Sequence, residues 1–543
     1  MTQGIFTIPT PYNEPVRSYE PGSKDKELLK KAVDELYNKE IDIPLYIGGE
    51  KIFEGKKAKC VIPSEHKHIL GHFHQAEKKH VDMAIKAAMD AKEDWANTPW
   101  QDRAAIFLKA AELLTDKYRY IFNAAGMLDL SKNAFQAEID VVCELADFYR
   151  FNAKYLEEIM KNQPASPKGQ WNRTDTRPLD GFVFAVTPFN FASIAGNLPT
   201  APALMGNTVL WKPASSAVYM AHFIMELLIE AGLPAGVINM IPGRGSVVGP
   251  MVIADNNFAG VHFTGSTNVF NGMWSTIGKN IDNYVTYPRI VGETGGKDFI
   301  FAHNTADIPA LVAATIRGAF EYQGQKCSAA SRAFIPKSIW PEYSKLLKEE
   351  MDTIKMGDVK DFRNFVNSVI DSMAFKSITT YIKYAKENED IEIFHGGNYD
   401  DSVGYFIEPT ILLCKDHNVR TMKEEIFGPV LSIFVYDDDK LDETLEICDK
   451  ASMYSLTGAV FSQDRNVIIK ITNALRGTAG NFYINDKPTG AVVGQQPFGG
   501  SRASGTNDKA GSILNLFRWV SPRTIKETFM PVTDYRYPTF EEE

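Results

Sequence analysis

In the first third of the chain, hydrophobic residues recur at helical spacing. Residues 24–38, 81–96, 102–130 and about 134–160 place apolar side chains three or four positions apart, among many Ala, Leu, Lys and Glu residues. Residues 44–74, by contrast, are typical of short strands and turns. The pattern therefore predicts a mostly helical N-terminal region with a few strands inserted.

From residue 182 the pattern changes to short apolar runs separated by helical segments. The runs are rich in β-branched and aromatic residues: FVFAV (182–186), TVLWK (208–212), VINMI (237–241), GVHFT (260–264) and FIFA (299–302). After the second run, a helix is predicted with Ser215 or Ser216 at its N-cap and Gly232 just past its end. Strands that alternate with helices predict βαβ units, a parallel sheet and a doubly wound architecture.

A second alternating region follows and predicts a second α/β domain. Its expected elements are a helix at 308–320, strands at 332–336, 407–413 and 430–436, and a helix at 440–450. Two polar segments, 169–180 and 521–532, fit neither core. We expect them to pair as an extended flap at a subunit interface.

Composition and charge narrow the class of protein. The 543 residues are 44% hydrophobic, which is ordinary for a globular protein and excludes a disordered or fibrous chain. The net charge of −10 argues against binding to nucleic acids or anionic membranes. The five cysteines are odd in number and form no CxxC motif, which favours a reducing compartment and no thiolate metal cluster.

One uncharged stretch resembles a membrane span, from Gly181 to Trp211. Pro188, Pro199 and Pro202 interrupt it, and in lipid the freed backbone groups would lack partners, so a buried soluble core is expected instead. The N-terminus has neither the apolar region of a secretory signal nor the arginines of a transit peptide. We expect a cytoplasmic protein, or a mitochondrial matrix protein if the source is eukaryotic.

Cys327 is the most prominent candidate for chemistry. It lies in EYQGQKCSAASR, between a predicted helix and a predicted strand. Its small polar neighbours predict an exposed loop, and the adjacent Lys326 is expected to favour the thiolate. The alternative is an inert buried cysteine, an interpretation that suits the other four cysteines better.

Two further side chains suit acid–base and oxyanion chemistry. In GETGGK (292–297), Glu293 sits beside two glycines, where a raised pKa would make it a general base; the alternative is a surface glutamate in a turn. In TPFNF (187–191), the amide of Asn190 follows a strand and suits donation to an oxyanion. The alternative for Asn190 is a helix N-cap, and both roles are compatible.

Three segments suit a nucleotide. In FTGST (263–267), Gly265 permits close backbone approach, and Ser266 or Thr267 begins a helix whose N–H groups suit a pyrophosphate, although an ordinary N-cap has the same pattern. Lys212, at a strand end, suits ribose hydroxyls or a phosphate, but is otherwise a solvated lysine. IPGRGSVVG (241–249) departs from GxGxxG spacing and is better interpreted as a turn before a helix.

Four histidines, His66, His68, His72 and His74, form two HxH pairs. No cysteine or carboxylate arrangement completes a site around them, so no metal is predicted.

Seven short motifs occur together in one order: TPFNF, WKPAS, FTGS, GETGGK, GQKCS, EEIFGP (424–429) and PFGG (497–500). With these motifs and the spacing of Glu293 and Cys327, the chain resembles the aldehyde dehydrogenase superfamily over nearly its whole length. Four longer segments are similar to one branch, the Δ1-pyrroline-5-carboxylate (glutamate-γ-semialdehyde) dehydrogenases: PFNFASIAGNLP (188–199), GETGGKDF (292–299), QGQKCSAASR (323–332) and TGAVVGQQPFGGSRASGTNDKAG (489–511).

The resemblance implies an α/β fold with three parts. A Rossmann-type NAD-binding domain is expected over residues 1–164 and 180–296, and a second α/β catalytic domain over 297–510. A small β oligomerisation flap and C-terminal tail are expected over 165–179 and 511–543, consistent with a homodimer or higher homo-oligomer.

The resemblance also implies a reaction: NAD-dependent oxidation of L-glutamate γ-semialdehyde to L-glutamate, the second step of proline catabolism. Cys327 is the expected nucleophile, which passes through a thiohemiacetal and a thioester. The oxyanion is expected on the Asn190 amide and the Cys327 backbone N–H, and Glu293 is expected to activate the hydrolytic water.

Ligand contacts follow from the same resemblance. For NAD they are Thr187, Lys212, Ser215, Gly265, Ser266, Thr294, Glu425 and Phe427. Ser215 stands where many relatives have a glutamate that repels a 2′-phosphate, so NAD is favoured without strict exclusion of NADP. For the substrate they are Phe191, Ser328, Gly490, Ala491 and Phe498, with backbone N–H groups at 490–491 anchoring the α-carboxylate.

Two departures from the family pattern affect the substrate site. Ala491 replaces a serine found in some members, which removes one side-chain hydrogen bond, and Phe189 replaces a common tryptophan. Two alternatives remain open: an NAD(P)-dependent dehydrogenase of another semialdehyde, such as succinic semialdehyde, and a non-catalytic structural or binding protein that keeps the fold.

Overall fold

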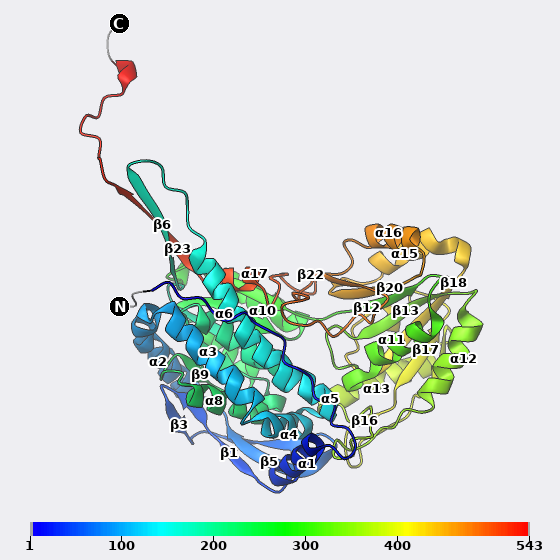
Figure 1. Ribbon diagram of the computed structural model, residues 1–543. Helices are drawn as coiled ribbons and strands as arrows, with labels where there is room; N and C mark the ends of the chain where they lie inside the picture. Colours follow the sequence, from blue (N-terminus) through cyan, green and yellow to red (C-terminus); the bar gives the residue numbers. More distant parts are fainter. Residues whose placement is uncertain (1–3, 541–543) are drawn as a thin grey trace.

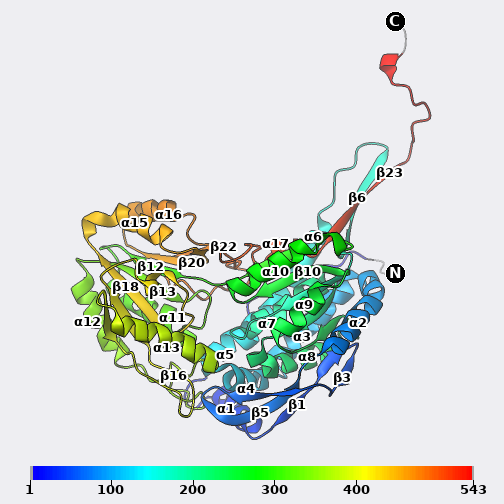
Figure 2. The same ribbon diagram turned by 180° about the vertical axis from the view of Figure 1, so that it is seen from behind.

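The computed structural model describes residues 4–540, arranged as two lobes and a projecting arm (Figure 1). The first lobe, coloured blue to green, is built on a seven-stranded sheet of order β11-β10-β7-β8-β9-β2-β3. The second, coloured green to orange, is built on a seven-stranded sheet of order β14-β17-β18-β13-β12-β20-β21. Figure 2 shows the same division from behind.

In the first sheet, the strands β11, β10, β7, β8 and β9 run parallel to one another. At the edge beyond β9, β2 pairs antiparallel with β9, and β3 pairs antiparallel with β2. Its strands are β2 (Leu45–Ile47), β3 (Glu50–Ile52), β7 (Phe182–Val186), β8 (Thr208–Lys212), β9 (Ile238–Met240), β10 (Phe258–Thr264) and β11 (Arg289–Glu293). Because helices cover both faces, strands β7, β8 and β10 are buried along their whole length, as their uninterrupted apolar runs predict.

Helices cover this sheet in two layers. On one face lie α2 (Lys78–Asn97), α9 (Gly245–Ile253) and α10 (Thr267–Lys279); on the other lie α3 (Trp100–Thr115), α7 (Ala192–Leu204) and α8 (Val218–Ala231). The predicted doubly wound architecture is confirmed. The chain builds outward from β7 to β9 and then returns to the other side of β7 with β10, so the strand order reverses between β7 and β10. In open α/β sheets, ligands bind at such a switch point.

The second sheet confirms the predicted second α/β unit. Its strands are β12 (Asp298–Ala302), β13 (Ala330–Pro336), β14 (Ile391–His395), β17 (Thr410–Cys414), β18 (Val430–Tyr436), β20 (Thr457–Phe461) and β21 (Asn481–Ile484), of which only β14 runs antiparallel within this sheet. Its helices are α11 (Ile308–Phe320), α12 (Trp340–Met351), α13 (Ser372–Glu387), α14 (Arg420–Lys423), α15 (Leu441–Lys450) and α16 (Arg465–Ala474).

The N-terminal helices are α1 (Lys24–Tyr37), α4 (Arg119–Leu130), α5 (Ala134–Ala137) and α6 (Leu145–Lys161), with a π-helix at Glu138–Glu144 between the last two. The single helix predicted over 102–130 is wrong. Helix α3 ends at Thr115, where the Arg119 side chain binds the Thr115 carbonyl, and α4 starts after a short turn. The helix predicted over 134–160 is likewise interrupted by the π-helix.

The helix predicted after Ser215 begins later than expected. A 3₁₀ turn occupies Ser215–Ala217, so the N-cap of α8 is Ala217 rather than a serine. The predicted C-terminal end is confirmed, because Gly232 adopts φ +106° directly after α8.

The arm is a two-stranded antiparallel sheet formed by segments that lie far apart in the sequence. Strands β6 (Gln170–Arg177) and β23 (Ser521–Thr528) pair antiparallel from Gln170↔Thr528 to Arg177↔Ser521. The predicted pairing is therefore confirmed, and Figure 1 shows this two-stranded sheet projecting from the first lobe. Helix α17 (Ile513–Phe517), just before β23, packs against α6.

Smaller elements complete the fold. They are the sheet of β1 (Ile41–Ile43), β5 (Glu65–His74) and β4 (Lys57–Ile62), and the pairs β15 (Tyr399–Asp400) with β16 (Phe406–Ile407) and β19 (Tyr454–Ser455) with β22 (Ser501–Arg502). Within residues 4–540, none of the helices combines the length and the apolar character needed to cross a bilayer.

Candidate active site

Two cavities meet at Cys327. The smaller, about 250 Å³, is lined by Glu293, Cys327 and a loop at 487–492; the larger, about 740 Å³, is lined by the carboxyl ends of β7, β8 and β10. Phe263, Thr264 and Cys327 line both. The thiol of Cys327 is therefore accessible to two ligands that approach from different sides.

A strained turn holds Cys327 at this junction. In the 3₁₀ segment before it, Tyr322 and Gln323 adopt left-handed backbone conformations, each with φ +54°. Such conformations cost about 1–3 kcal/mol each and persist only where the surroundings enforce them. Here the Tyr322 hydroxyl donates to the Leu130 carbonyl at 2.8 Å, and the Gln323 amide donates to Ser131 and Ser368 carbonyls. Contacts far apart in the chain thus determine where the sulfur lies.

The expected environment of Cys327 is wrong in two respects. The residue is 7% exposed rather than in an open loop. The Lys326 ammonium is paired with Glu321 at 3.0 Å, and the pKa of the Cys327 thiol is raised well above its ordinary value, first by burial and then by nearby carboxylates, Glu293 foremost. The resting residue is therefore a thiol that must lose its proton during the reaction.

Glu293 ends strand β11 and faces the smaller cavity. Burial raises the pKa of its carboxyl to about 8, and its Oε1 finds no hydrogen-bond partner within the described part of the chain. The alternative of a surface glutamate in a turn is therefore wrong, whereas the predicted rise in pKa is confirmed. A group with this pKa is matched to proton transfer near neutral pH.

A loop that carries Lys509 encloses Glu293. Gly505 forms a β-bridge with Glu293, and Thr294 N–H donates to the Ser504 carbonyl at 2.9 Å. The Lys509 ammonium donates to the carbonyls of Gly480 and Gly499, each at 2.8 Å, which holds it at the same cavity. Its positive charge lowers the pKa of Glu293, opposing the effect of burial.

The variant Lys509→Met is expected to move the acid limb of the kcat–pH profile to higher pH. Glu293 must be ionised to act as a base, so activity rises as pH increases through its pKa, and loss of the nearby cation raises that pKa further. The measurement is kcat from about pH 6 to about pH 9, with Lys509→Arg as the charge-preserving control. Superimposable profiles for wild type and Lys509→Met would contradict the electrostatic coupling.

Asn190 lies four residues after the end of β7 and, like Cys327, lines the larger cavity. Its side chain is buried, and its Nδ2 donates to the Gln325 carbonyl at 3.1 Å. The N-cap of α7 is Phe191, so the N-cap alternative for Asn190 is wrong. An amide nitrogen carries two hydrogens, and this bond to Gln325 uses one of them.

The larger cavity collects seven of the eight expected cofactor contacts: Thr187, Lys212, Gly265, Ser266, Thr294, Glu425 and Phe427. Ser215 lies just beyond Ala214, which does line it. Lys212 is buried rather than solvated, and burial lowers the pKa of its ammonium to about 8. The Gly296 N–H donates to Glu425 Oε1 at 2.9 Å, which orients that carboxylate.

The shape of this cavity suits a dinucleotide. It lies at the switch point between β7 and β10, and Ser266 begins α10 without a side-chain cap. A Cβ on Gly249 or Gly272 would meet no heavy atom within 4 Å, so both helices α9 and α10 present open space to a ligand. Of the segment 241–249, residues 241–244 form the predicted turn and residues 245–249 already belong to α9; Gly245 and Gly249 also line the cavity.

The smaller cavity contains all five expected substrate contacts: Phe191, Ser328, Gly490, Ala491 and Phe498. Gly490 has φ +92°, which turns the backbone of its loop at the cavity wall. The hydroxyls of Ser328 and Thr489 hydrogen-bond at 2.8 Å and tie this loop to the residue after Cys327. Their proposed roles toward a substrate are taken up below.

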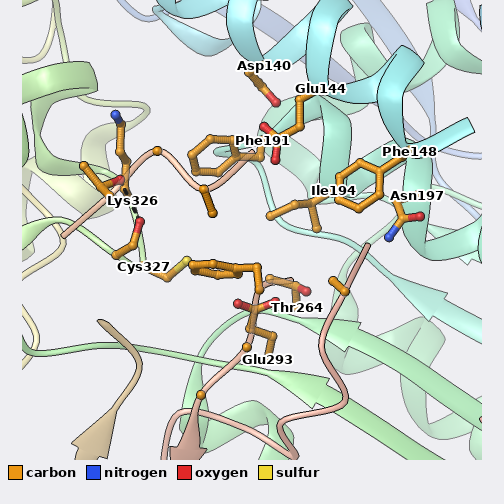
Figure 3. A pocket seen from close by; sticks show the side chains of 18 of the residues that line it. Asp140, Glu144, Phe148, Phe191, Ile194, Asn197, Thr264, Glu293, Lys326 and Cys327 are labelled. Carbon is orange, nitrogen blue, oxygen red and sulfur yellow. Dashed lines mark hydrogen bonds between the residues drawn. The ribbon is translucent and has the colours of Figure 1, made fainter. Parts of the chain in front are cut away.

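Sequence reasoning missed an acidic wall of this cavity. Asp140 and Glu144 project from the π-helix on the side opposite Glu293 (Figure 3). Asp140 accepts hydrogen bonds from the first turn of α7 and lies 3.2 Å from the buried Lys132 ammonium. Burial raises the pKa of Glu144 to about 8. The available signal was the set of three acids, Glu138, Asp140 and Glu144, among the apolar residues of the segment 138–144.

The four histidines do not converge. His68 stacks on Tyr37 and His66 on Tyr405, while His74 lies 3.2 Å from Asp42. No group of three or more metal-ligating side chains occurs between residues 4 and 540.

Comparison with known proteins agrees with this geometry. Residues 53–524 match the model of the aldehyde dehydrogenase family. A Dictyostelium discoideum protein named mitochondrial delta-1-pyrroline-5-carboxylate dehydrogenase is 53% identical over 98% of this chain and 96% of its own, and the Homo sapiens protein of that name is 47% identical over 97% and 93%. The crystal structure of delta-pyrroline-5-carboxylate dehydrogenase from Mycobacterium tuberculosis bound with NAD is similar over 100% of both chains, with a TM-score of 0.96 and 49% identity.

Proposed function

Because the chain belongs to the aldehyde dehydrogenase family, we propose that it oxidises L-glutamate γ-semialdehyde, in equilibrium with Δ1-pyrroline-5-carboxylate, to L-glutamate with NAD. This is the second step of proline catabolism, the activity named for the relatives above. The observation that carries the proposal is the position of Cys327 between a nucleotide-sized cavity and a smaller one that contains Glu293 and the loop at 490–491.

The chemistry begins at the sulfur. The Cys327 thiol releases its proton to water and attacks the aldehyde carbon, which forms a thiohemiacetal whose oxygen accepts hydrogen bonds from the Asn190 amide and the Cys327 backbone N–H. Loss of one such donor typically costs about 10²–10³ in rate. The residues of the larger cavity would hold NAD, which would supply the acceptor for the hydride that leaves the former aldehyde carbon.

The second half-reaction belongs to Glu293. Cys327 retains the acyl group as a thioester, and Glu293 removes a proton from the water that attacks it. The tetrahedral adduct then breaks its C–S bond, the Cys327 sulfur takes the proton back from Glu293, and the carboxylic acid leaves. Burial, which raises the pKa of Glu293 to about 8, keeps the carboxylate basic enough for this step.

Substrate selection is assigned to the rest of the smaller cavity. Backbone N–H groups at Gly490 and Ala491, together with Ser328, bind the α-carboxylate, while Phe191 and Phe498 flank the aliphatic chain. The test is NADH production with Δ1-pyrroline-5-carboxylate, succinic semialdehyde and propanal. The proposal requires the highest kcat/KM for the first, and a far higher value for succinic semialdehyde would replace it with the alternative dehydrogenase.

Cofactor choice gives a separate prediction at Ser215. A glutamate at this position would repel the negatively charged 2′-phosphate that NADP has and NAD lacks. Ser215→Glu is therefore expected to raise KM for NADP by about 10-fold or more and to change KM for NAD little. The measurement is KM for both cofactors, with Ser216→Glu as the neighbouring control. Equal effects on NAD and NADP would show that position 215 does not face the 2′ position.

The organisation of the protein is also part of the proposal. Residues 1–164 and 180–296 form the NAD-binding domain, 297–510 the catalytic domain, and 165–179 with 511–543 the flap and tail that join subunits into a homodimer or larger homo-oligomer. The exposed Trp171 and Phe529 on the arm support this role. The proposed compartment is the cytoplasm, or the mitochondrial matrix if the source is a eukaryote. The two relatives whose names include the word mitochondrial support the matrix.

A further inference from the structure

Residues 4–23, before α1, form an extended strap that lies across α6 and α5 (Figure 1, dark blue). Buried ionic groups hold it in place. The Glu14 carboxylate accepts hydrogen bonds from Arg119 and Arg150, each at 2.8 Å, and the Tyr19 hydroxyl donates to Glu138 at 2.6 Å. The strap is therefore a fixed part of the fold with a defined register on these helices.

At Asn13 the strap meets the loop that carries Gly490 and Ala491, residues 487–496, here called the anchor loop. Asn13 Nδ2 donates to the Val493 carbonyl and to Asp147 Oδ2, each at 2.8 Å, and its Oδ1 accepts from Gln495 Nε2 at 2.9 Å. Both amide hydrogens and the amide oxygen of Asn13 are used. One side chain thus connects the strap, helix α6 and the anchor loop.

The anchor loop has other supports besides Asn13, including a hydrogen bond within the loop from Val492 N–H to Gln496 Oε1 at 2.9 Å. Near the nucleophile, Thr489 is hydrogen-bonded to Ser328. On the far side, the backbone at Gly494 packs directly on Phe151 of α6, since a Cβ there would lie 2.1 Å from the ring. Gly490 and Ala491 lie between these supports, and their position depends on both.

The strap also reaches the substrate cavity itself. Val16, three residues beyond Asn13, lines the same cavity as Gly490, Ala491 and Cys327. Since Glu14 N–H donates to Asp147 Oδ1 at 2.8 Å, Asp147 fixes Asn13 and the start of this wall together. A segment almost 500 positions from the anchor loop along the chain thus completes one side of the cavity.

We propose that Asn13 is a positioning residue for substrate specificity: it holds the anchor loop so that the backbone N–H groups at 490–491 meet the α-carboxylate of the aldehyde. The inference rests on the proposed function and extends it to the strap. Asn13 acts on the binding of carboxylate-bearing aldehydes and leaves attack by Cys327 unchanged, because its hydrogen bonds go to Asp147, Val493 and Gln495 and none reaches the nucleophile.

The test is Asn13→Ala in the full-length enzyme. Loss of its hydrogen bonds to the loop is expected to raise KM for glutamate semialdehyde by about 10-fold, with kcat within about twofold. KM for propanal, which has no carboxylate, is expected to stay unchanged. Asn38→Ala is the matched control, since Asn38 donates to the Asp34 carbonyl at the exposed end of α1. This variant is expected to leave KM for both aldehydes unchanged.

A second variant protects the test against misfolding. Gln495→Ala removes one contact to Asn13 from the exposed side of the loop, and it is expected to change the same KM in the same direction by a smaller factor. Equal changes for both aldehydes, or no change for glutamate semialdehyde in either variant, overturns the inference and leaves the proposed function standing. A wild-type enzyme that oxidises propanal but not glutamate semialdehyde overturns both.

Discussion

The variant Cys327→Ala is expected to lower kcat for glutamate semialdehyde by about 10⁵-fold, because it removes the sulfur that forms the covalent adduct. Its folding and NAD binding are expected to persist, since the cavity walls that hold the nucleotide come from other residues. NADH production and the thermal shift with NAD measure the two effects. Cys448→Ala, in a buried cysteine that lines neither cavity, is the control and is expected to stay active.

This variant also tests the alternative of a non-catalytic protein. Turnover by Cys327→Ala near the wild-type rate would remove Cys327 from the mechanism. A wild-type protein that oxidised no aldehyde, gave no thermal shift with NAD and alkylated Cys327 no faster than a free thiol would favour a structural or binding role.

The second large effect is expected for Glu293→Gln. The amide cannot accept a proton from water, so steady-state turnover is expected to fall by about 10³-fold, within the usual range for loss of a general base. Oxidation of the thiohemiacetal precedes hydrolysis, so a burst of NADH close to one equivalent per active site is expected before the slow phase. Rapid-mixing absorbance measures the burst, and Glu158→Gln, an exposed glutamate on α6, is the control.

Absence of the burst would assign Glu293 a different role. If the first turnover were slowed as much as the steady state, the carboxylate would be required before the thioester forms, for example to accept the proton of the Cys327 thiol, whose raised pKa requires such a base.

The regular elements were predictable where apolar pattern alone decides them. The segments expected at 182–186, 208–212, 308–320 and 430–436 coincide with β7, β8, α11 and β18. In each segment, the apolar residues are either nearly continuous or repeat at helical spacing, so only one type of element buries them. The π-helix at Glu138–Glu144 and the left-handed turn at Tyr322–Gln323 were not predictable, because long-range hydrogen bonds and ion pairs hold them.

The environment of Cys327 shows the same limit at the site. Its small polar neighbours suggested exposure, yet Ser328 is buried and its hydroxyl is hydrogen-bonded to Thr489 inside the protein. Adjacency to Lys326 suggested a stabilised thiolate, yet the ammonium pairs with Glu321, and carboxylates from other segments surround the sulfur. Motif order predicted which residues line the cavities, but not the charges between them.

Intact-protein and peptide mass spectrometry of Glu293→Gln mixed with NAD and Δ1-pyrroline-5-carboxylate tests the central claim most directly. The account predicts a glutamyl adduct on the peptide that contains Cys327 and an unmodified mass at Cys60, Cys143, Cys414 and Cys448. An adduct on another cysteine, or NADH formation with no adduct on any cysteine, would contradict it.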